Sequence, residues 1–241
     1  MTTIPRPSPL PHLSTTGSSR VHAANLPVTP HHRSLVAVDI EGSTTRTNVA
    51  RARFRNVMYG LVEEAMLTAG IGEACRDELV DRGDGILAIV HPVDEVPKTV
   101  LLDTMIPTLS TLLRHYNNRD HTQSTALRMR AVIHAGEVHY DERGCFGEAV
   151  DLSFRLLESP ELKRRLARSD APLVLVVSEE IYSSVVRHGY DGIDHLGFEP
   201  LVHVQMAGRR HRGWVNFPNA AVVPNQRVRP VIDLDSRRDR A

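Results

Sequence analysis

An Asp-Gly pair between two short apolar runs is the feature that most constrains how this 241-residue chain can fold. Gly83-Asp84-Gly85 separates the runs 79–82 and 86–91. Asp-Gly between strand-like runs is the strongest short-range signal for a β-hairpin, because both residues tolerate the left-handed backbone of a tight turn. The sequence therefore predicts two paired strands here, with Asp84 at or beside the tip of their turn.

The segment before this hairpin has the pattern of a strand, a tight loop and a helix. Residues 34–40 form a short β-branched run, and Glu41-Gly42-Ser43-Thr44 supplies turn and N-cap chemistry. Over residues 47–68 apolar side chains recur at helical spacing, and glycines that can end a helix follow. We therefore expect a strand and a helix ahead of the hairpin.

The rest of the chain continues to alternate helices and strands. Pro107 should kink or split one of the helices, because proline lacks the backbone N–H. The predicted elements are a helix over 94–117, a strand over 127–134, a polar hairpin between Gly136 and Gly144, a helix over 147–166, a strand over 173–177, a helix over 179–187 and strands near 201–205 and 214–217. This order predicts an α+β fold with a ferredoxin-like βαββαβ core, extended at its C-terminal end, in which helices cover mostly one face of a mixed sheet.

Charge and hydropathy argue against several classes of partner. Lys+Arg and Asp+Glu balance at 29 each, and aromatic residues make up only 5%, so neither a basic field nor base stacking favours nucleic acid. The apolar runs are far shorter than the ~20 residues that cross a bilayer. We expect a cytoplasmic protein with no membrane or nucleic-acid partner, and we expect Cys75 and Cys145 to be reduced.

The two ends of the chain differ from its middle. Residues 1–33 are rich in Pro, Ser, Thr and His and poor in large apolar residues, so they are expected to form a flexible arm. Residues 218–241 combine three prolines with an arginine-containing, mixed-charge end and are expected to form a second tail. Residues 34–217 remain as one domain.

Two aspartates are predicted to meet at one end of the sheet. Asp39 closes the first strand, and Asp84 lies at the turn of the hairpin expected beside it. Carboxylates in this position suit Mg²⁺ or Mn²⁺, which bind one or two carboxylates together with substrate phosphates. Gly42 and the backbone amides of Ser43 and Thr44, at a helix start, offer an anion site. Taken alone, an Asp-Gly pair is more simply a turn.

Four segments, in one order, resemble motifs of the class III nucleotidyl cyclase catalytic domain. Residues 34–44, Ser-Leu-Val-Ala-Val-Asp-Ile-Glu-Gly-Ser-Thr, are similar to the opening strand and metal loop of that family, and residues 82–90 are similar to its metal hairpin. Residues 127–138 resemble its central strand and turn, and residues 146–157 resemble its catalytic helix. The resemblance covers residues 34–217 and implies the fold of that family.

The resemblance also implies an activity, the conversion of a nucleoside triphosphate to a 3′,5′-cyclic nucleotide and pyrophosphate. It implies that Asp39, Asp84 and the backbone carbonyl of Ile40 hold two Mg²⁺ or Mn²⁺ ions. Arg155 matches the arginine that stabilises the transition state in the family. Because the family's active sites form between two antiparallel domains, a homodimer with shared sites, or a pair with a related chain, is implied.

Three positions depart from the family pattern. Asp151 replaces the catalytic asparagine and, when ionised, cannot donate a hydrogen bond, so slower turnover is expected. Val80 and Gly144 stand where the family has a lysine and an acidic residue that read the purine, which leaves the base preference open. Asp81 or Arg82 can replace them only if the strand register is shifted.

These departures leave two interpretations open. One is an active cyclase, and the other is a nucleotide-binding or regulatory module with weak or no catalysis. Asp151 and Arg155 also have the spacing of an ordinary i,i+4 ion pair on a helix surface. A structural role is the expectation for His134, at the end of a strand.

Overall fold

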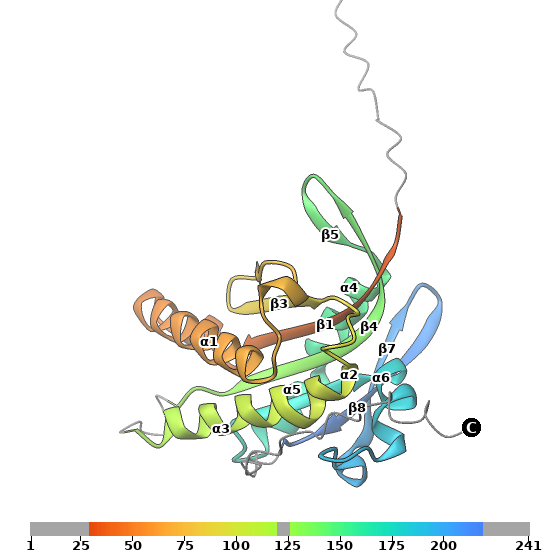
Figure 1. The fold of residues 1–241 in the computed structure, drawn as a ribbon. Helices are drawn as coiled ribbons and strands as arrows, with labels where there is room; N and C mark the ends of the chain where they lie inside the picture. The colour runs from red at the N-terminus through yellow and green to blue at the C-terminus, as the bar shows by residue number, and fades with distance from the viewer. Residues whose placement is uncertain (1–28, 120–125, 219–241) are drawn as a thin grey trace, which may run out of the picture.

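The computed structural model describes residues 29–119 and 126–218 and centres on a mixed β-sheet (Figure 1). Within these residues the strands are β1 His31–Ile40, β2 Val80–Asp81, β3 Gly85–Val90, β4 Met129–Asp141, β5 Gly144–Phe146, β6 Leu173–Ser178, β7 Glu199–Met206 and β8 Arg209–Asn216. Their order across the sheet is β2-β3-β1-β4-β6-β8-β7, and β5 pairs with the end of β4. β1 therefore lies inside the sheet, antiparallel to both β3 and β4.

Helices connect these strands in the order that the sequence predicts. They are α1 Asn48–Thr68, α2 Lys98–Val100, α3 Ile106–Asn117, α4 Glu148–Leu157, α5 Pro160–Ala167 and α6 Glu179–Ser184, with single turns η1 Ser43–Thr45, η2 Glu73–Cys75, η3 Leu101–Met105, η4 Val186–His188 and η5 His195–Gly197. The predicted α+β fold with its βαββαβ core is confirmed. In the described part of the chain, no helix has both the length and the apolar character needed to cross a bilayer.

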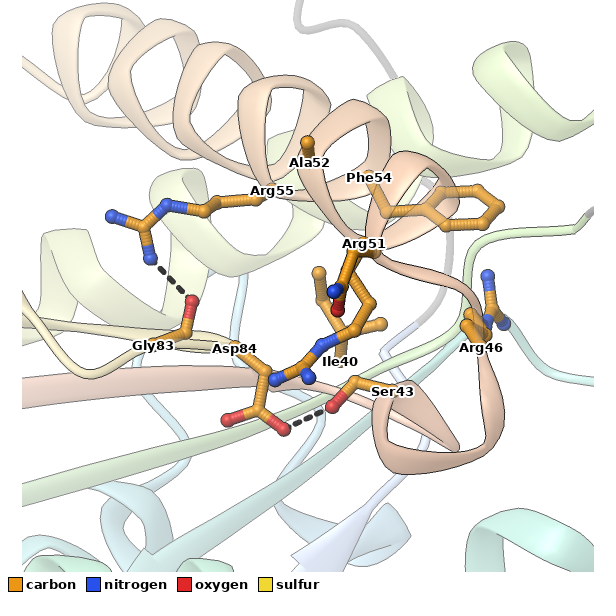
Figure 2. A pocket seen from close by; sticks show the side chains of 10 residues that line it. Ile40, Ser43, Arg46, Arg51, Ala52, Phe54, Arg55, Gly83 and Asp84 are labelled. Carbon is orange, nitrogen blue, oxygen red and sulfur yellow. Dashed lines mark hydrogen bonds between the residues drawn. The ribbon is translucent and has the colours of Figure 1, made fainter.

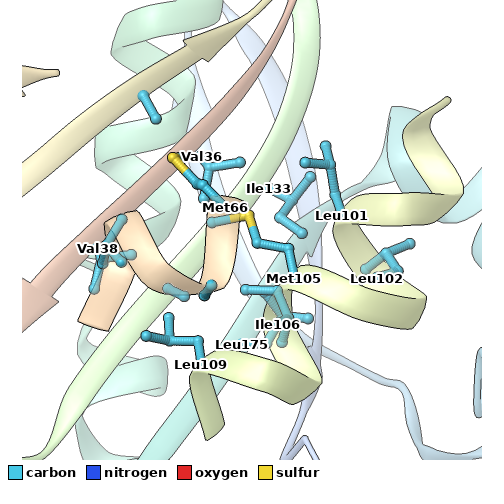
Figure 3. Packing of buried hydrophobic residues seen from close by; sticks show 14 of the residues in the cluster. Val36, Val38, Met66, Leu101, Leu102, Met105, Ile106, Leu109, Ile133 and Leu175 are labelled. Atoms are coloured by element: carbon cyan, nitrogen blue, oxygen red, sulfur yellow. The ribbon is translucent and has the colours of Figure 1, made fainter. Parts of the chain in front are cut away.

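Helices cover both faces of the sheet, so the expectation that they cover mostly one face is wrong. Alternate residues of β1 belong to two separate cores, because successive side chains of a strand point to opposite faces. Val36 and Val38 pack with α1, η3 and α3, as Figure 3 shows. Leu35 and Ala37 pack with α4 and α5 on the other side. A strand buried on both faces reads as a continuous apolar run, and that run does not reveal the second helical layer.

The helix expected over 147–166 is two helices, α4 and α5, and that prediction is wrong. α4 ends at Leu157, and Ser159 then caps α5 by accepting a hydrogen bond from the N–H of Leu162 at 3.3 Å. Pro160 occupies the first turn of α5, where its missing N–H has no cost. A Ser-Pro pair inside a helical pattern thus marks a new helix start.

The helix expected over 94–117 begins at Lys98 and contains a π-helical turn, η3, ahead of α3. Pro107 has no N–H to donate to the carbonyl four residues before it, that of Asp103, which lies in this turn. The predicted disruption by Pro107 is therefore confirmed as a π turn that keeps the buried side of the helix continuous. Leu101 and Met105 in this turn remain almost fully buried.

β4 is longer than the strand expected over 127–134. It continues through Gly136 to Asp141 and pairs with β5, so the predicted polar hairpin is the outer part of β4 with β5. This β4–β5 hairpin projects from the body of the domain (Figure 1). β1 starts at His31, inside the segment expected to be a flexible arm. Residues 1–28 and 219–241 of the two predicted tails lie outside the described residues.

Candidate functional site

β1 and the β2–β3 hairpin bring Asp39 and Asp84 to the same end of the sheet. Asp39 lies opposite Gly85 in the antiparallel register, and the N–H of Ile40 donates to the carbonyl of Asp84 at 3.0 Å. The hairpin closes with a 3.0 Å bond from the N–H of Arg82 to the carbonyl of Gly85. Asp84 is therefore a turn residue held next to the last residue of β1. Its negative charge acts to raise the pKa of the Asp39 carboxyl.

Asp39 is also a cross-strand neighbour of Arg130 on β4. The guanidinium of Arg130 donates from Nε to Oδ1 of Asp39 at 2.8 Å and from Nη2 to Oδ2 at 2.5 Å. Both side chains are nearly buried, with exposed fractions of 15% for Asp39 and 11% for Arg130. Burial raises the pKa of the Asp39 carboxyl, while the Arg130 hydrogen bonds act to lower it. Sequence reasoning missed this pair, although an arginine in a strand buried on both faces signals that a partner exists.

The loop after β1 supplies the other neighbours of Asp84. The hydroxyl of Ser43, which is buried, donates to Oδ2 of Asp84. Gly42 has the left-handed φ of 67° that the tight turn requires, and Thr45 closes the turn by donating from its hydroxyl to the Gly42 carbonyl at 2.9 Å. Thr44 is exposed at the same turn. The predicted anion loop and the two aspartates are thus adjacent.

The residues present can supply part of the coordination shell of a divalent cation, and substrate phosphates and water would supply the remaining ligands. Among the described residues, no group of three or more His, Cys, Asp or Glu side chains is close enough to hold a metal ion. Asp39 and Asp84 supply two carboxylates at one end of β1, next to Ile40. Each carboxylate oxygen has two lone pairs, so the bonds from Arg130 and Ser43 leave acceptor capacity. Mg²⁺ typically binds one or two carboxylates and takes its remaining ligands from phosphates and water.

The positions that read the base in the resembling family have no polar side chain here. Val80 lies opposite Leu87 in β2 and packs against the core on the α4 side of the sheet. Gly144 is exposed in β5, and its neighbour Cys145 packs against that same core. Neither position offers a directional hydrogen bond from a side chain.

Asp81 and Arg82 do not take the place of these residues. The register of β2 is unshifted, with Asp81 opposite Ile86, so Asp81 faces α1. There Arg55 donates to both of its carboxylate oxygens, which lowers the pKa of Asp81. Arg82 lies over the ring of Phe154 on α4, with 4.3 Å from its Cζ to the ring centroid.

Asp151 and Arg155 lie on the exposed surface of α4. Among the described residues, no ion pair joins the two side chains, so the i,i+4 pair expected as an ordinary interpretation is not formed. Among the described residues, no hydrogen bond or ion pair joins Arg155 to Asp39 or to Asp84.

His134 is buried, at 4% exposure, and its Nδ1 lies 2.8 Å from the hydroxyl of Ser178 and 3.5 Å from Oε2 of Glu180. The His134 hydrogen bond is the main cause that lowers the pKa of Glu180 to about 2. These contacts tie β4 to the start of α6. They agree with the structural role expected for His134.

A cavity of about 220 Å³ lies beside Asp84, between the first turns of α1 and the β2–β3 turn (Figure 2). Three arginines, Arg46, Arg51 and Arg55, line it together with Ser43 and Asp84. Sequence reasoning did not single out these arginines. The available signal was that the three lie within ten residues around the predicted start of the helix.

Comparison with known proteins agrees on the fold. An adenylate/guanylate cyclase/hydrolase from Silicibacter pomeroyi superposes with a TM-score of 0.56 at 18% identity, over 80% of this chain and 99% of that chain. The adenylyl cyclase CyaB from P. aeruginosa gives a TM-score of 0.53 at 14% identity, over 79% and 96%. The guanylyl cyclase Cya2 gives 0.52 at 16% identity, over 82% and 97%. No family model and no curated protein matches the sequence.

At these identities the likeness establishes the architecture. The chain shares the fold of these solved adenylyl and guanylyl cyclase structures, to which it is 14–18% identical. The compared proteins include both adenylyl and guanylyl cyclases.

Proposed function

We propose that this protein is a metal-dependent nucleotidyl cyclase that converts a nucleoside triphosphate to a 3′,5′-cyclic nucleotide and pyrophosphate. The observation that carries the proposal is the adjacency of Asp39 and Asp84 beside the loop at Gly42, in a fold shared with solved adenylyl and guanylyl cyclases. In this reaction the ribose 3′-oxygen forms a bond to the α-phosphorus. The bond from that phosphorus to the oxygen bridging to the β-phosphate breaks, and pyrophosphate leaves while the hydroxyl proton passes to water.

The chain's own residues divide this work. Asp39, Asp84 and the carbonyl of Ile40 would hold two Mg²⁺ or Mn²⁺ ions, which supply charge neutralisation and make the 3′-hydroxyl more acidic. Ser43 positions Asp84 through its hydroxyl bond. The amides of Ser43 and Thr44, after the left-handed turn at Gly42, would bind phosphate oxygens.

We further propose that two copies of the chain assemble with shared sites. The support is that Arg155 lies on an exposed helix surface and, among the described residues, forms no hydrogen bond or ion pair with Asp39 or Asp84. A second copy would bring its guanidinium to the α-phosphate. In an equal mixture of inactive Asp84→Asn and Arg155→Ala chains, about half of the dimers are mixed and each has one intact site, so about a quarter of wild-type activity should return. An inactive mixture of chains that do exchange subunits would contradict the shared site.

A second candidate is a nucleotide-binding module with weak or no catalysis. The observations that favour it are the apolar surroundings of Val80 and the absence of a side chain at Gly144. Asp151, an exposed acid on α4 where the resembling family has asparagine, also favours it.

One assay separates the two functions. Purified protein is incubated with Mn²⁺ and each of the four ribonucleoside triphosphates, and the products are separated by chromatography. An active cyclase gives a cyclic nucleotide and an equal amount of pyrophosphate, and Asp84→Asn abolishes both. Asp94→Asn, at an exposed aspartate outside the site, serves as the matched control and should leave them unchanged.

The other outcomes are equally informative. No cyclic product with any base, together with Mn²⁺-dependent triphosphate binding that Asp84→Asn removes, would identify the binding module. Neither product nor metal-dependent binding would overturn both functions.

A further inference from the structure

The carboxylate of Asp77 links two parts of the sheet that are not neighbours. Asp77 lies just before β2 and is fixed beside β3, because its N–H donates to the carbonyl of Ile89 at 2.9 Å. Its Oδ2 accepts a 2.8 Å hydrogen bond from the hydroxyl of Tyr140, in the outer part of β4, residues 136–141. Since β1 lies between β3 and β4 in the sheet, this contact spans the strand between them.

His91 orients the same carboxylate through its other oxygen. This histidine follows β3, and its Nε2 lies 2.7 Å from Oδ1 of Asp77. A carboxylate can only accept hydrogen bonds, so Nε2 is the atom that donates. The N–H of His91 in turn donates to the carbonyl of Cys75 at 2.8 Å, which fixes the backbone on that side. Bonds to both oxygens therefore hold the Asp77 carboxylate in one orientation.

The ring of Tyr140 also contacts β1. His31 meets the ring edge-on, with 5.9 Å between the two centroids, and Cζ of Arg33 lies 5.9 Å from the centroid of the phenol ring. Burial, and after it the Asp77 hydrogen bond, raises the pKa of Tyr140 to about 12. The phenol therefore keeps its proton and donates to Asp77 throughout the neutral pH range.

The outer part of β4 is in tight contact with the start of α4. A Cβ added at Gly136 would lie 2.9 Å from Cβ of Ala149, in the first turn of α4. A Cβ added at Gly147, the N-cap of α4, would lie 3.0 Å from Cδ2 of His139. The N–H of Asp151 closes this first turn by donating to the carbonyl of Gly147 at 3.1 Å. Because close-packed groups transmit strain, a shift of the outer part of β4 would displace the first turn of α4.

We propose that Asp77 is a positioning residue for α4, acting through Tyr140 and the outer part of β4. This role rests on the proposed function, in which Arg155 on α4 acts at the α-phosphate. Asp77 acts through other residues and not on the substrate. Its carboxylate holds Tyr140, the outer part of β4 holds the first turn of α4, and α4 presents the guanidinium of Arg155.

The first test is hydrogen–deuterium exchange of the full chain. Tyr140→Phe removes the hydroxyl and keeps the ring, so it breaks the contact with Asp77 alone. Backbone amides of residues 136–146 and 151–152 should exchange about tenfold faster, as the loss of a hydrogen bond to a charged acceptor predicts. Exchange in β8 should not change, which excludes a general loss of stability. Tyr190→Phe, at an exposed tyrosine between η4 and η5, is the matched control and should exchange as the wild type does.

Steady-state kinetics with the triphosphate that the wild type cyclises give the functional readout. Tyr140→Phe should lower kcat by about tenfold and leave KM within about twofold, because Arg155 acts in the transition state. Asp77→Ala should have the same effect. Asp77→Asn should recover most of the turnover, since its amide oxygen still accepts from Tyr140 and its amide nitrogen can donate to the other tautomer of His91. Tyr140→Phe keeps the test decisive if Asp77→Ala fails to fold.

Three results would overturn the positioning role. They are unchanged exchange in Tyr140→Phe, faster exchange in residues 136–146 with none at 151–152, and faster exchange in both segments with an unchanged kcat. A failure of the proposed function has a different signature. If the wild type makes no cyclic nucleotide while Tyr140→Phe still speeds exchange at 151–152, the proposed function is wrong and the coupling of Asp77 to α4 stands.

Discussion

Asp39 and Arg130 face each other across β1 and β4, and the guanidinium of Arg130 binds both carboxylate oxygens of Asp39, at 2.8 and 2.5 Å. The pair lies on the side of the sheet that α4 and α5 cover, because Asp39 follows Leu35 and Ala37 on that side of β1. An aspartate proposed to hold a divalent ion is thus already oriented and partly neutralised by an arginine. The two hydrogen bonds from Arg130 fix the orientation of the Asp39 carboxylate.

We predict that Arg130→Met destabilises the protein by about 3–5 kcal/mol, because it leaves the nearly buried Asp39 charge without its partner. The measurement is urea unfolding at neutral pH. Asp39→Asn and the double variant complete a double-mutant cycle. The double variant should be more stable than the sum of the two single losses predicts, whereas strictly additive losses would show that the two side chains act independently.

Gly85→Ala should destabilise the hairpin and the site with it. An added Cβ at Gly85 would lie 2.7 Å from the carbonyl oxygen of Val38 and 3.3 Å from Cβ of Asp39, so β1 and β3 must move apart. Gly60→Ala, in the middle of α1 with open space around an added Cβ, should instead stabilise the protein by about 0.5–1 kcal/mol. Thermal unfolding of both variants checks this pair, and equal shifts in one direction would count against it.

Asp151→Asn should raise turnover if the proposed reaction operates, because the asparagine removes an anion near the triphosphate and restores a hydrogen-bond donor. We expect an increase in kcat of about tenfold, the effect of a barrier lowered by 1.4 kcal/mol. Glu158→Gln, at an exposed acid just after the same helix, is the control for a general change of charge. Unchanged or lower turnover in Asp151→Asn would refute the role assigned to this position.

Glu180 should make the stability of the protein depend on pH in the acid range. The hydrogen bond with His134 is the main cause that lowers the pKa of Glu180 to about 2 in the folded chain, against an ordinary value of 4.5. This contribution is therefore complete above pH 4.5 and is lost as the pH falls toward 2. Glu180→Gln should reduce the pH dependence of the urea unfolding midpoint between pH 2 and 4.5. Glu63→Gln, at an exposed site on α1, should leave that dependence unchanged. Parallel profiles would contradict the assignment.

Local turn chemistry allowed part of the site to be predicted from the sequence. The hairpin around Gly83-Asp84-Gly85 and the left-handed turn at Gly42 depend on residues within a few positions of one another, and the structure has both, although the left-handed residue of the hairpin is Gly83 and Gly85 already belongs to β3. Contacts over longer separations could not be predicted in this way. The partnership of Asp39 with Arg130 joins residues 91 positions apart, and it depends on which strands are neighbours in the sheet.

The number of sheet faces that helices cover could not be predicted from the sequence either. The buried strands read as continuous apolar runs, so their sequence does not state how many faces are covered. The break between α4 and α5 was present in the sequence as Ser159-Pro160, and the helical pattern on either side concealed it. The cavity at Arg46 and Arg51 required the packing of the loop and α1 against the hairpin, which no local pattern encodes.

Binding of Mn²⁺ to the purified protein, measured by the loss of the free-ion electron paramagnetic resonance signal, shows whether Asp39 and Asp84 form a metal site. We predict that the wild type and Asp94→Asn bind Mn²⁺ alike and that Asp84→Asn weakens binding by about tenfold or more, since it removes a carboxylate ligand. If folded Asp84→Asn binds Mn²⁺ as tightly as the wild type, the aspartates do not form a metal site and the proposed cyclase chemistry is wrong.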